Sequence, residues 1–231
     1  MIRLSKWMSL KSLCSRREAE EFIQLGLVRV GGRRVFENML VPYEASLKAF
    51  TPAGIQVKKP ITKLWMINKP RGYICTHRDP QRRNTLYELF PPSFSVFGHL
   101  MTVGRLDFNS EGLLLVTNDN SLKALLENPS ASLTRVYRVK VHGRVSPEKL
   151  QKMNSPISIK GVTYGPLNVN IDRELSTNVW LNVSMRTGKN REIRRVMEKC
   201  DLQVNKLIRV SYGPYKIGPV TVSLFSSPTE K

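Results

Sequence analysis

The sequence is poor in the residues that build metal centres and disulfide frameworks. Its 231 residues include three cysteines and three histidines. Cys14, Cys75 and Cys200 form no C-x-x-C pair, so they give neither a disulfide framework nor a zinc site, and they favour a reducing compartment. The histidines are scattered along the chain. We therefore expect no metal and no cofactor.

Acidic residues are also few. Lys+Arg number 37 against 18 Asp+Glu, which gives a formal net charge of +19 and a sequence pI near 10.2. Such an excess predicts a polyanionic partner and favours nucleic acid. A membrane is not expected, because no stretch approaches the roughly 18 apolar residues of a spanning helix. We expect a monomer.

The first 17 residues hold five Lys or Arg, four Ser and no acidic residue. This composition fits a mitochondrial transit peptide, which would place the protein in the mitochondrial matrix, and it also fits a folded basic helix. The next predicted element follows at once without a linker. We therefore expect the folded helix and a cytoplasmic protein, with the mitochondrial matrix as the alternative.

Residues 1–35 are predicted to form two helices and a hairpin. Apolar residues at helical spacing between 4 and 8 predict the first helix, and the capping-box pattern Ser15-Arg16-Arg17-Glu18 begins the second. Residues 27–30 and 33–35 are predicted strands joined at Gly31-Gly32. Residues 46–63 are predicted to end this module as a linker. We expect an N-terminal domain over 1–60 and a second domain over 61–231.

The second domain has a polar loop between two predicted strands. Residues 101–103 and the apolar run 113–117 are the strands, and Gly104-Arg105-Leu106-Asp107-Phe108-Asn109-Ser110-Glu111-Gly112 lies between them. Loops held by buried strands often carry catalytic groups. An ordinary turn with a solvated Asp107 is the alternative.

Further elements follow along the second domain. Residues 121–126 and 146–153 are predicted helices, and residues 134–141, 162–171 and 178–185 are predicted strands. On residues 134–141, Tyr137 shares one face with two valines. Asn190 is predicted to cap a helix that carries three arginines. The predicted fold class is α+β: a small N-terminal α/β RNA-binding module, then a domain on an antiparallel or mixed sheet.

The 104–119 stretch resembles the catalytic signature of the RsuA/RluB family of ribosomal RNA pseudouridine synthases. The matching pattern is G-R-L-D, then Ser110, then G-L-L and the ending T-N-D. Asn120 replaces the glycine that usually closes this motif. Residues 68–72 and 188–195 are similar to two other family motifs, whereas the tail from Gly218 lacks the usual ending. Residues 15–32 resemble the alpha-L RNA-binding motif that is also found in a small-subunit ribosomal protein.

The resemblance implies roles for individual residues. Asp107 is the expected catalytic carboxylate, Arg194 its partner, and Tyr137 the ring that stacks on the target base, with Arg105 and Leu207 in the substrate pocket. A guanidinium beside a carboxylate in a partly dry pocket favours its ionised form. Eight further cations are expected to bind RNA: Arg16, Arg17, Arg33, Arg34, Lys69, Arg71, Arg191 and Arg195. The polar loop 76–83 is either a further RNA contact or merely solvated.

These observations predict an enzyme that isomerises one uridine of ribosomal RNA to pseudouridine. The sequence L-I-R-V-S-Y-G at 207–213 is closer to large-subunit enzymes than to small-subunit enzymes. The expected partner is therefore ribosomal RNA or a pre-ribosomal particle. The alternative is a non-catalytic ribosome-assembly factor that keeps the fold and the charge.

Overall fold

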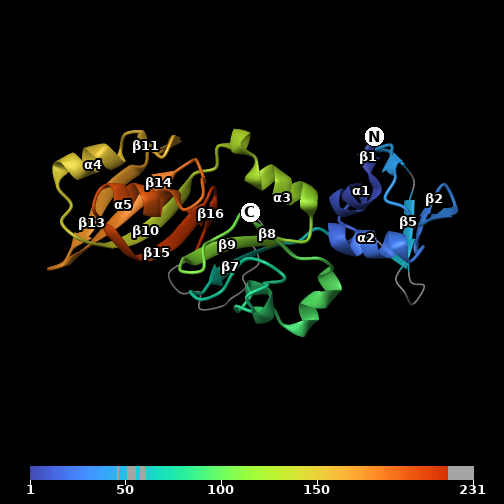
Figure 1. The fold of residues 1–231 in the computed structure, drawn as a ribbon. Coiled ribbons are helices and arrows are strands. Elements are labelled where there is room, and N and C mark those ends of the chain that lie inside the picture. The colour runs from blue at the N-terminus through green and yellow to red at the C-terminus, as the bar shows by residue number, and fades with distance from the viewer. Residues whose placement is uncertain (46, 51–55, 58–60, 218–231) are drawn as a thin grey trace. The chain divides into compact units, whose positions relative to one another are not determined.

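The computed structural model describes residues 1–45, 47–50, 56–57 and 61–217 (Figure 1). It separates into two compact units. The first comprises Met1–Leu64, Pro91–Met101 and Val116–Leu125, and the second comprises Trp65–Phe90, Thr102–Leu115 and Leu126–Lys231. The domain boundary expected near residue 60 and the tail from Gly218 lie outside the described residues.

The first unit contains the predicted helices and hairpin. Helices α1 (Leu4–Leu10) and α2 (Arg16–Gln24) pack against each other, and α2 begins with the expected capping box between Ser15 and Glu18. Strand β1 (Ile2–Arg3) pairs with β4 (Leu40–Val41). A second small sheet has the order β3-β2-β5-β6, with bounds Arg33–Val35, Val28–Val30, Leu47–Phe50 and Gln56–Val57. Leu4, Met8 and Ala19 are fully buried in the core.

The largest sheet is mixed, which is one of the two alternatives that the sequence left open. Its main path has the order β13-β14-β10-β15-β9-β7, and β8 and β16 pair with β9 and β15. The bounds along this path are Asn168–Glu174, Asn178–Met185, Arg135–His142, Gln203–Tyr212, Glu111–Thr117 and Leu64–Lys69. Strands β8 (Met101–Val103) and β16 (Tyr215–Lys216) are short. Five strand pairs of this sheet have a defined register within residues 61–217. Of these, β15–β9 is parallel and the other four are antiparallel.

Helices and short turns surround this sheet. Helices α4 (Pro147–Met153) and α5 (Glu192–Lys199) pack against β13 and β15 respectively. The hairpin β11 (Ile157–Ile159) and β12 (Val162–Tyr164) lies next to α5. Three 3-10 turns cover Leu86–Leu89 (η1), Pro92–Phe97 (η2) and Pro129–Ala131 (η3), and α3 spans Asn120–Glu127.

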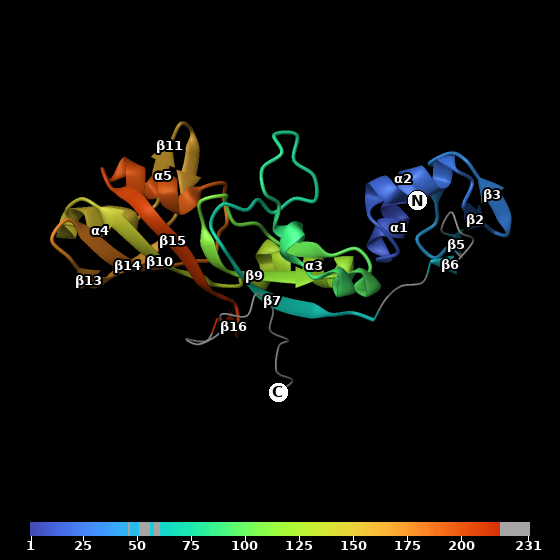
Figure 2. The ribbon, with the colours of Figure 1, turned by 90° about the horizontal axis from the view of Figure 1, so that it is seen from below.

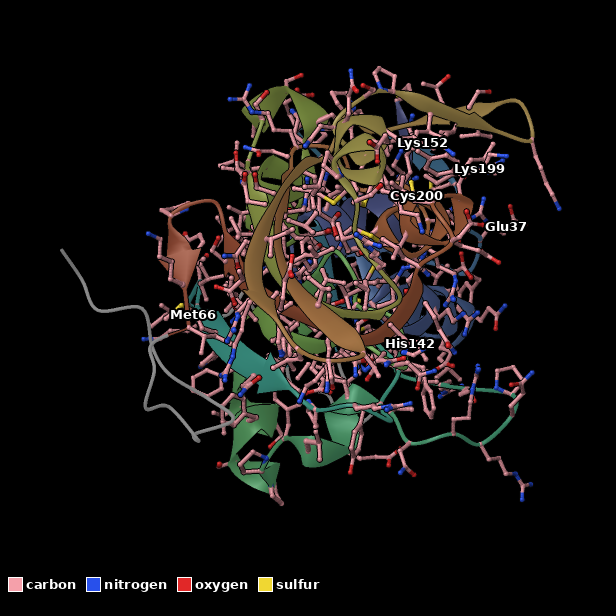
Figure 3. The ribbon with its side chains drawn as sticks, turned by 90° about the vertical axis from the view of Figure 1, so that its left-hand side faces the viewer. Glu37, Met66, His142, Lys152, Lys199 and Cys200 are labelled. Atoms are coloured by element: carbon pink, nitrogen blue, oxygen red, sulfur yellow. The ribbon has the colours of Figure 1, made fainter. Side chains whose placement is uncertain are left out.

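The carboxyl end of α5 is held by its neighbour α4. The Lys152 ammonium donates a hydrogen bond to the Lys199 carbonyl at 3.1 Å, and Figure 3 shows both residues beside Cys200. A cation at this end of a helix also complements the helix dipole. This contact helps to fix the helix that brings arginines to the site.

Two local predictions were wrong. The single strand expected at 162–171 is two strands, β12 and β13, interrupted at Gly165-Pro166, because proline has no N–H to donate to a ladder. Helix α5 is not capped by Asn190. It starts after Arg191, whose φ of 51° is left-handed, and the buried Glu192 carboxylate accepts from the amide of Lys189 instead.

Asn120 is the first residue of α3, one residue before the expected start. Its φ is not left-handed, so tolerance of that conformation does not explain why asparagine replaces glycine here. Its side-chain amide donates to the Ser9 carbonyl at 3.1 Å, and its backbone N–H donates to the Ser12 hydroxyl at 2.9 Å. These contacts join α3 to the end of α1 within the first unit.

Candidate active site

The Asp107 loop, residues 104–110, connects β8 to β9. Gly104 begins it with φ at +65°, a left-handed conformation that glycine adopts without a steric penalty. Ser110 ends it and is buried, and its N–H donates back to the Asp107 carbonyl at 3.0 Å. The Asp107 side chain is 33% exposed. The carboxylate therefore sits in a defined turn that solvent and substrate can reach.

Lys69, at the end of β7, holds this turn through hydrogen bonds to its carbonyls. It is 1% exposed, and its ammonium donates to the carbonyls of Pro70, Asp107 and Ser110 at 3.0, 3.2 and 2.9 Å. Burial lowers the pKa of Lys69, while nearby acidic groups such as Asp107 oppose that shift. All three donors of an ammonium are used here. The RNA-binding role expected for Lys69 therefore does not fit the structure.

The two carbonyls between Asp107 and Ser110 also have donors. The Gly72 N–H donates to the Phe108 carbonyl, and Arg194 Nη2 donates to the Asn109 carbonyl, both at 2.9 Å. Every carbonyl from Asp107 to Ser110 thus accepts a hydrogen bond. A reactive group held in this way needs little reorganisation when a substrate arrives.

Two guanidiniums approach the Asp107 carboxylate. Arg191 Nη1 and Arg194 Nε each lie 3.8 Å from Asp107 Oδ2. The Arg194 side chain is 14% exposed and that of Arg191 is 51% exposed. Burial lowers the pKa of Arg194, and the charge of Asp107 opposes this. The sequence predicted the Arg194 pairing, but it placed Arg191 among the RNA contacts alone.

Neighbouring strands form an apolar floor that contains Tyr137 and Leu207. Tyr137 on β10 lies opposite Arg209 on β15, and Leu207 shares the buried face of β15. Arg209 pairs in turn with Gly112 of β9, directly after the Asp107 loop. A Cβ on Gly112 would lie 2.2 Å from the Arg209 carbonyl, so only glycine permits this close pairing. The sheet thereby links the tyrosine to the loop.

The remaining expected RNA contacts lie in several places. Arg71 is exposed, and its Nε donates to the Asn109 side chain of the Asp107 loop at 3.2 Å. Arg105, which was expected in the substrate pocket, is exposed on the same loop. Arg195 is half-buried and donates to the Tyr164 hydroxyl at 2.5 Å. The other four expected RNA contacts are exposed arginines of the first unit: Arg16, Arg17, Arg33 and Arg34.

Sequence reasoning missed two buried charged residues. Glu192 is 2% exposed, and its carboxylate accepts from the Thr187 hydroxyl and the Gly165 N–H as well as from Lys189. Arg209 is 2% exposed and donates from Nε to the Leu113 carbonyl at 2.7 Å. Glu192 lies inside the 188–195 motif, so its position was visible in the sequence, but its partner Gly165 lies 27 positions away along the chain.

No set of three His, Cys, Asp or Glu side chains among the described residues is grouped as a metal site. Within the same residues, no helix has the length and apolar character needed to cross a bilayer.

A carboxylate that lies 3.8 Å from two guanidiniums, on a loop held by hydrogen bonds, defines a site for acid–base or nucleophilic chemistry. Comparison with known proteins narrows this class. The family model for RNA pseudouridylate synthase matches residues 63–199, and the S4 domain model matches residues 2–41. The chain belongs to the RNA pseudouridylate synthase family and is an RNA pseudouridine synthase.

Individual relatives agree with this assignment. A protein from Rickettsia bellii called an uncharacterized RNA pseudouridine synthase is 38% identical over 100% of this chain and 98% of its own length. A ribosomal large subunit pseudouridine synthase B from Buchnera aphidicola is 31% identical over 91% of this chain and 86% of its own. A crystal structure of a pseudouridylate synthase aligns with a TM-score of 0.62 at 21% identity, covering 92% and 89% of the two chains. That structural similarity supports the α+β fold.

Proposed function

We propose that this enzyme isomerises a specific uridine of large-subunit ribosomal RNA and that Asp107 is its catalytic carboxylate. The observation that supports this most is the position of Asp107, 3.8 Å from both Arg191 and Arg194 on a loop whose carbonyls from Asp107 to Ser110 all accept hydrogen bonds. The ribosomal target is inferred from relatives that carry the name large subunit pseudouridine synthase B. The sequence match at 207–213 points the same way.

The reaction is an isomerisation and needs no external redox partner. The bond between the ribose anomeric carbon and the uracil nitrogen breaks, the base turns, and a carbon–carbon bond to the ribose forms. The ring carbon loses its proton and the released nitrogen gains one. Asp107 is placed to act as nucleophile or proton acceptor in this sequence. Arg194 supplies a positive charge 3.8 Å from the carboxylate oxygen.

Tyr137 and Leu207 would form the base pocket. A uridine that leaves its stack loses a few kcal/mol, and an aromatic ring recovers part of this by stacking on the base. Tyr137 is 8% exposed and Leu207 is 6% exposed, so little of either surface is open before RNA binds. We propose that Arg105, exposed on the Asp107 loop, contacts the RNA at the mouth of this pocket.

The first 60 residues would supply RNA affinity. The S4 match covers most of the described part of this segment, and Arg16, Arg17, Arg33 and Arg34 are all exposed on it. Exposed cations that each neutralise a phosphate release counterions, so binding should weaken steeply with salt.

A chemical map of pseudouridine in ribosomal RNA, with and without the gene, tests this proposal. We expect one site, or a small set of sites, in large-subunit RNA to disappear on deletion and to return with the wild-type gene. The Asp107→Asn gene should not restore them. Loss of sites in small-subunit RNA alone would reject the proposed target. Unchanged maps would favour a non-catalytic role in ribosome assembly.

A further inference from the structure

A column of aromatic rings links the loop between β7 and η1 to η1 and to the residue after it. Figure 2 shows this loop as an arch between β7 and the following turn. The His77 and Tyr87 rings are parallel within 14° with centroids 3.5 Å apart, and Tyr87 and Phe90 follow with centroids 5.7 Å apart. We call His77, Tyr87 and Phe90 the ring stack. His77 is its exposed end.

The ring stack is fixed to the strand that leads into the Asp107 loop. The Tyr87 hydroxyl accepts a hydrogen bond from the Thr102 N–H of β8 at 3.2 Å. Burial raises the pKa of Tyr87 to about 12, so the hydroxyl keeps its proton at neutral pH. The middle ring of the column therefore has a defined position relative to β8.

The base of the arch is bonded to the Asp107 loop itself. The Cys75 thiol donates to the Leu106 carbonyl at 3.4 Å, and the Gly72 N–H donates to the Phe108 carbonyl at 2.9 Å. These carbonyls belong to the two neighbours of Asp107. His77 is only two residues beyond Cys75, so the exposed ring and the carboxylate are parts of one connected framework.

The tip of the arch is a rigid, cationic turn. Arg83 binds the Asp79 carboxylate through Nε at 2.9 Å and through Nη2 at 2.8 Å, and this pairing lowers the pKa of Asp79 to about 2. Arg82 has a backbone φ of 54°, a left-handed conformation that residues other than glycine rarely adopt. Arg78 and Arg82 are exposed and have no carboxylate within ion-pair distance among the described residues. The turn thus presents two cations without an acidic partner in that part of the chain.

An exposed ring that is followed along the chain by exposed cations is a surface that suits unpaired RNA. Bases stack on such rings in a sequence-tolerant way, while cations contact the phosphates between them. We propose that His77 is a stacking platform for an unpaired base next to the target uridine, with Arg78 and Arg82 on the flanking phosphates. This inference rests on the proposed function, because it takes RNA as the ligand, and it adds the site that holds the flanking strand.

The test uses the full-length protein and a single-stranded, uridine-rich RNA oligonucleotide that contains one 2-aminopurine. Stacking quenches the fluorescence of this base. We expect His77→Ala to lower affinity by about tenfold and to remove most of the quenching, with an unchanged salt dependence. His77→Phe keeps a ring and should retain both signals.

Arg82→Ala is the matched control in the same turn. It should leave the quenching intact and reduce the slope of affinity against salt by about one phosphate. Wild-type affinity and quenching in His77→Ala would overturn the platform. The binding and quenching measurements do not depend on turnover. A failure to form pseudouridine would therefore count against the proposed function without affecting the test of the His77 platform.

Discussion

At the scale of one residue, Lys69 is a buried charge that holds the backbone of the Asp107 loop in place instead of binding the substrate. Its three carbonyl partners include those of Asp107 and Ser110. Burial lowers the pKa of Lys69, and the charges of nearby groups such as Cys75 and Asp107 oppose this shift. The three carbonyls satisfy the donors of the buried ammonium, which would otherwise be costly to bury. The sequence showed a lysine in a basic turn. It did not show that the turn folds against the Asp107 loop.

Replacing this lysine should slow the reaction without weakening RNA binding. Lys69→Met removes the donors and lets the loop move, so we expect the single-turnover rate to fall roughly a hundredfold, as for a misplaced reactive group. Affinity and its salt dependence should stay at wild-type values. Arg71→Met is the control from the same turn and should chiefly weaken binding. A normal rate with weaker binding in Lys69→Met would contradict this role.

The two arginines beside Asp107 should differ in their effects. Arg194 is mostly buried, so Arg194→Met leaves the carboxylate without its protected cation, and we expect a rate loss of about 10²–10³-fold at saturating enzyme. Arg191 is half exposed, and solvent weakens such pairs, so Arg191→Met should slow the reaction only a few-fold. Single-turnover rates with separately measured affinities decide this. Equal losses in both variants would mean that burial does not distinguish the two arginines.

At the scale of elements, the parallel contact between β9 and β15 connects the loop to the base pocket. Gly112 has φ at +101°, and a methyl group there would collide with the Arg209 backbone. We expect Gly112→Ala to destabilise the fold by at least about 3 kcal/mol, since strain and overpacking add. Gly161→Ala is the matched control. Its φ is +77° with open space around it, so it should cost only about 1 kcal/mol. Urea unfolding of both variants gives the comparison, and similar losses would contradict the close-pairing argument.

Local patterns in the sequence predicted elements well where a few neighbours decide the structure. The capping box at Ser15 and the buried face of Tyr137 are examples, since each depends on residues within one turn or strand. The start of α5 and the bonds of Asn120 depend on residues far along the chain: Gly165 bonds Glu192, and Ser9 bonds Asn120. The Asp107–Arg194 pair was predicted only through family resemblance. The two residues lie 87 positions apart in the sequence, and no local pattern indicates that they are close together.

At the scale of the whole molecule, two weakly acidic groups, the Cys14 thiol and the Tyr87 phenol, affect the stability of the fold at alkaline pH. Burial raises the pKa of Cys14 to about 12 from 9.0, and burial raises that of Tyr87 to about 12 from 10.0. Both groups bind a proton more tightly in the folded state than in the unfolded state. Their stabilisation is therefore complete below pH 9 and is lost as the pH rises toward 12.

We expect the free energy of unfolding to fall between pH 9 and 12. Each group contributes about 1.4 kcal/mol per pH unit over the range in which its unfolded form is ionised and its folded form is not. Cys14→Ala should reduce this slope without changing the contribution of Tyr87. Urea titrations at several pH values provide the measurement. A slope that is identical in Cys14→Ala would show that this thiol does not titrate differently on unfolding.

The central claim is that Asp107 performs the chemistry, and its most direct test compares Asp107→Asn with Asp119→Asn. Asp119 is a buried carboxylate that accepts from the Thr62 hydroxyl and from the N–H groups of Ser121 and Leu122, so its loss should lower stability and leave turnover in place. The measurement is single-turnover pseudouridine formation on RNA that contains the mapped uridine. We expect no product with Asp107→Asn despite normal RNA binding. Turnover by Asp107→Asn at the wild-type rate would contradict it.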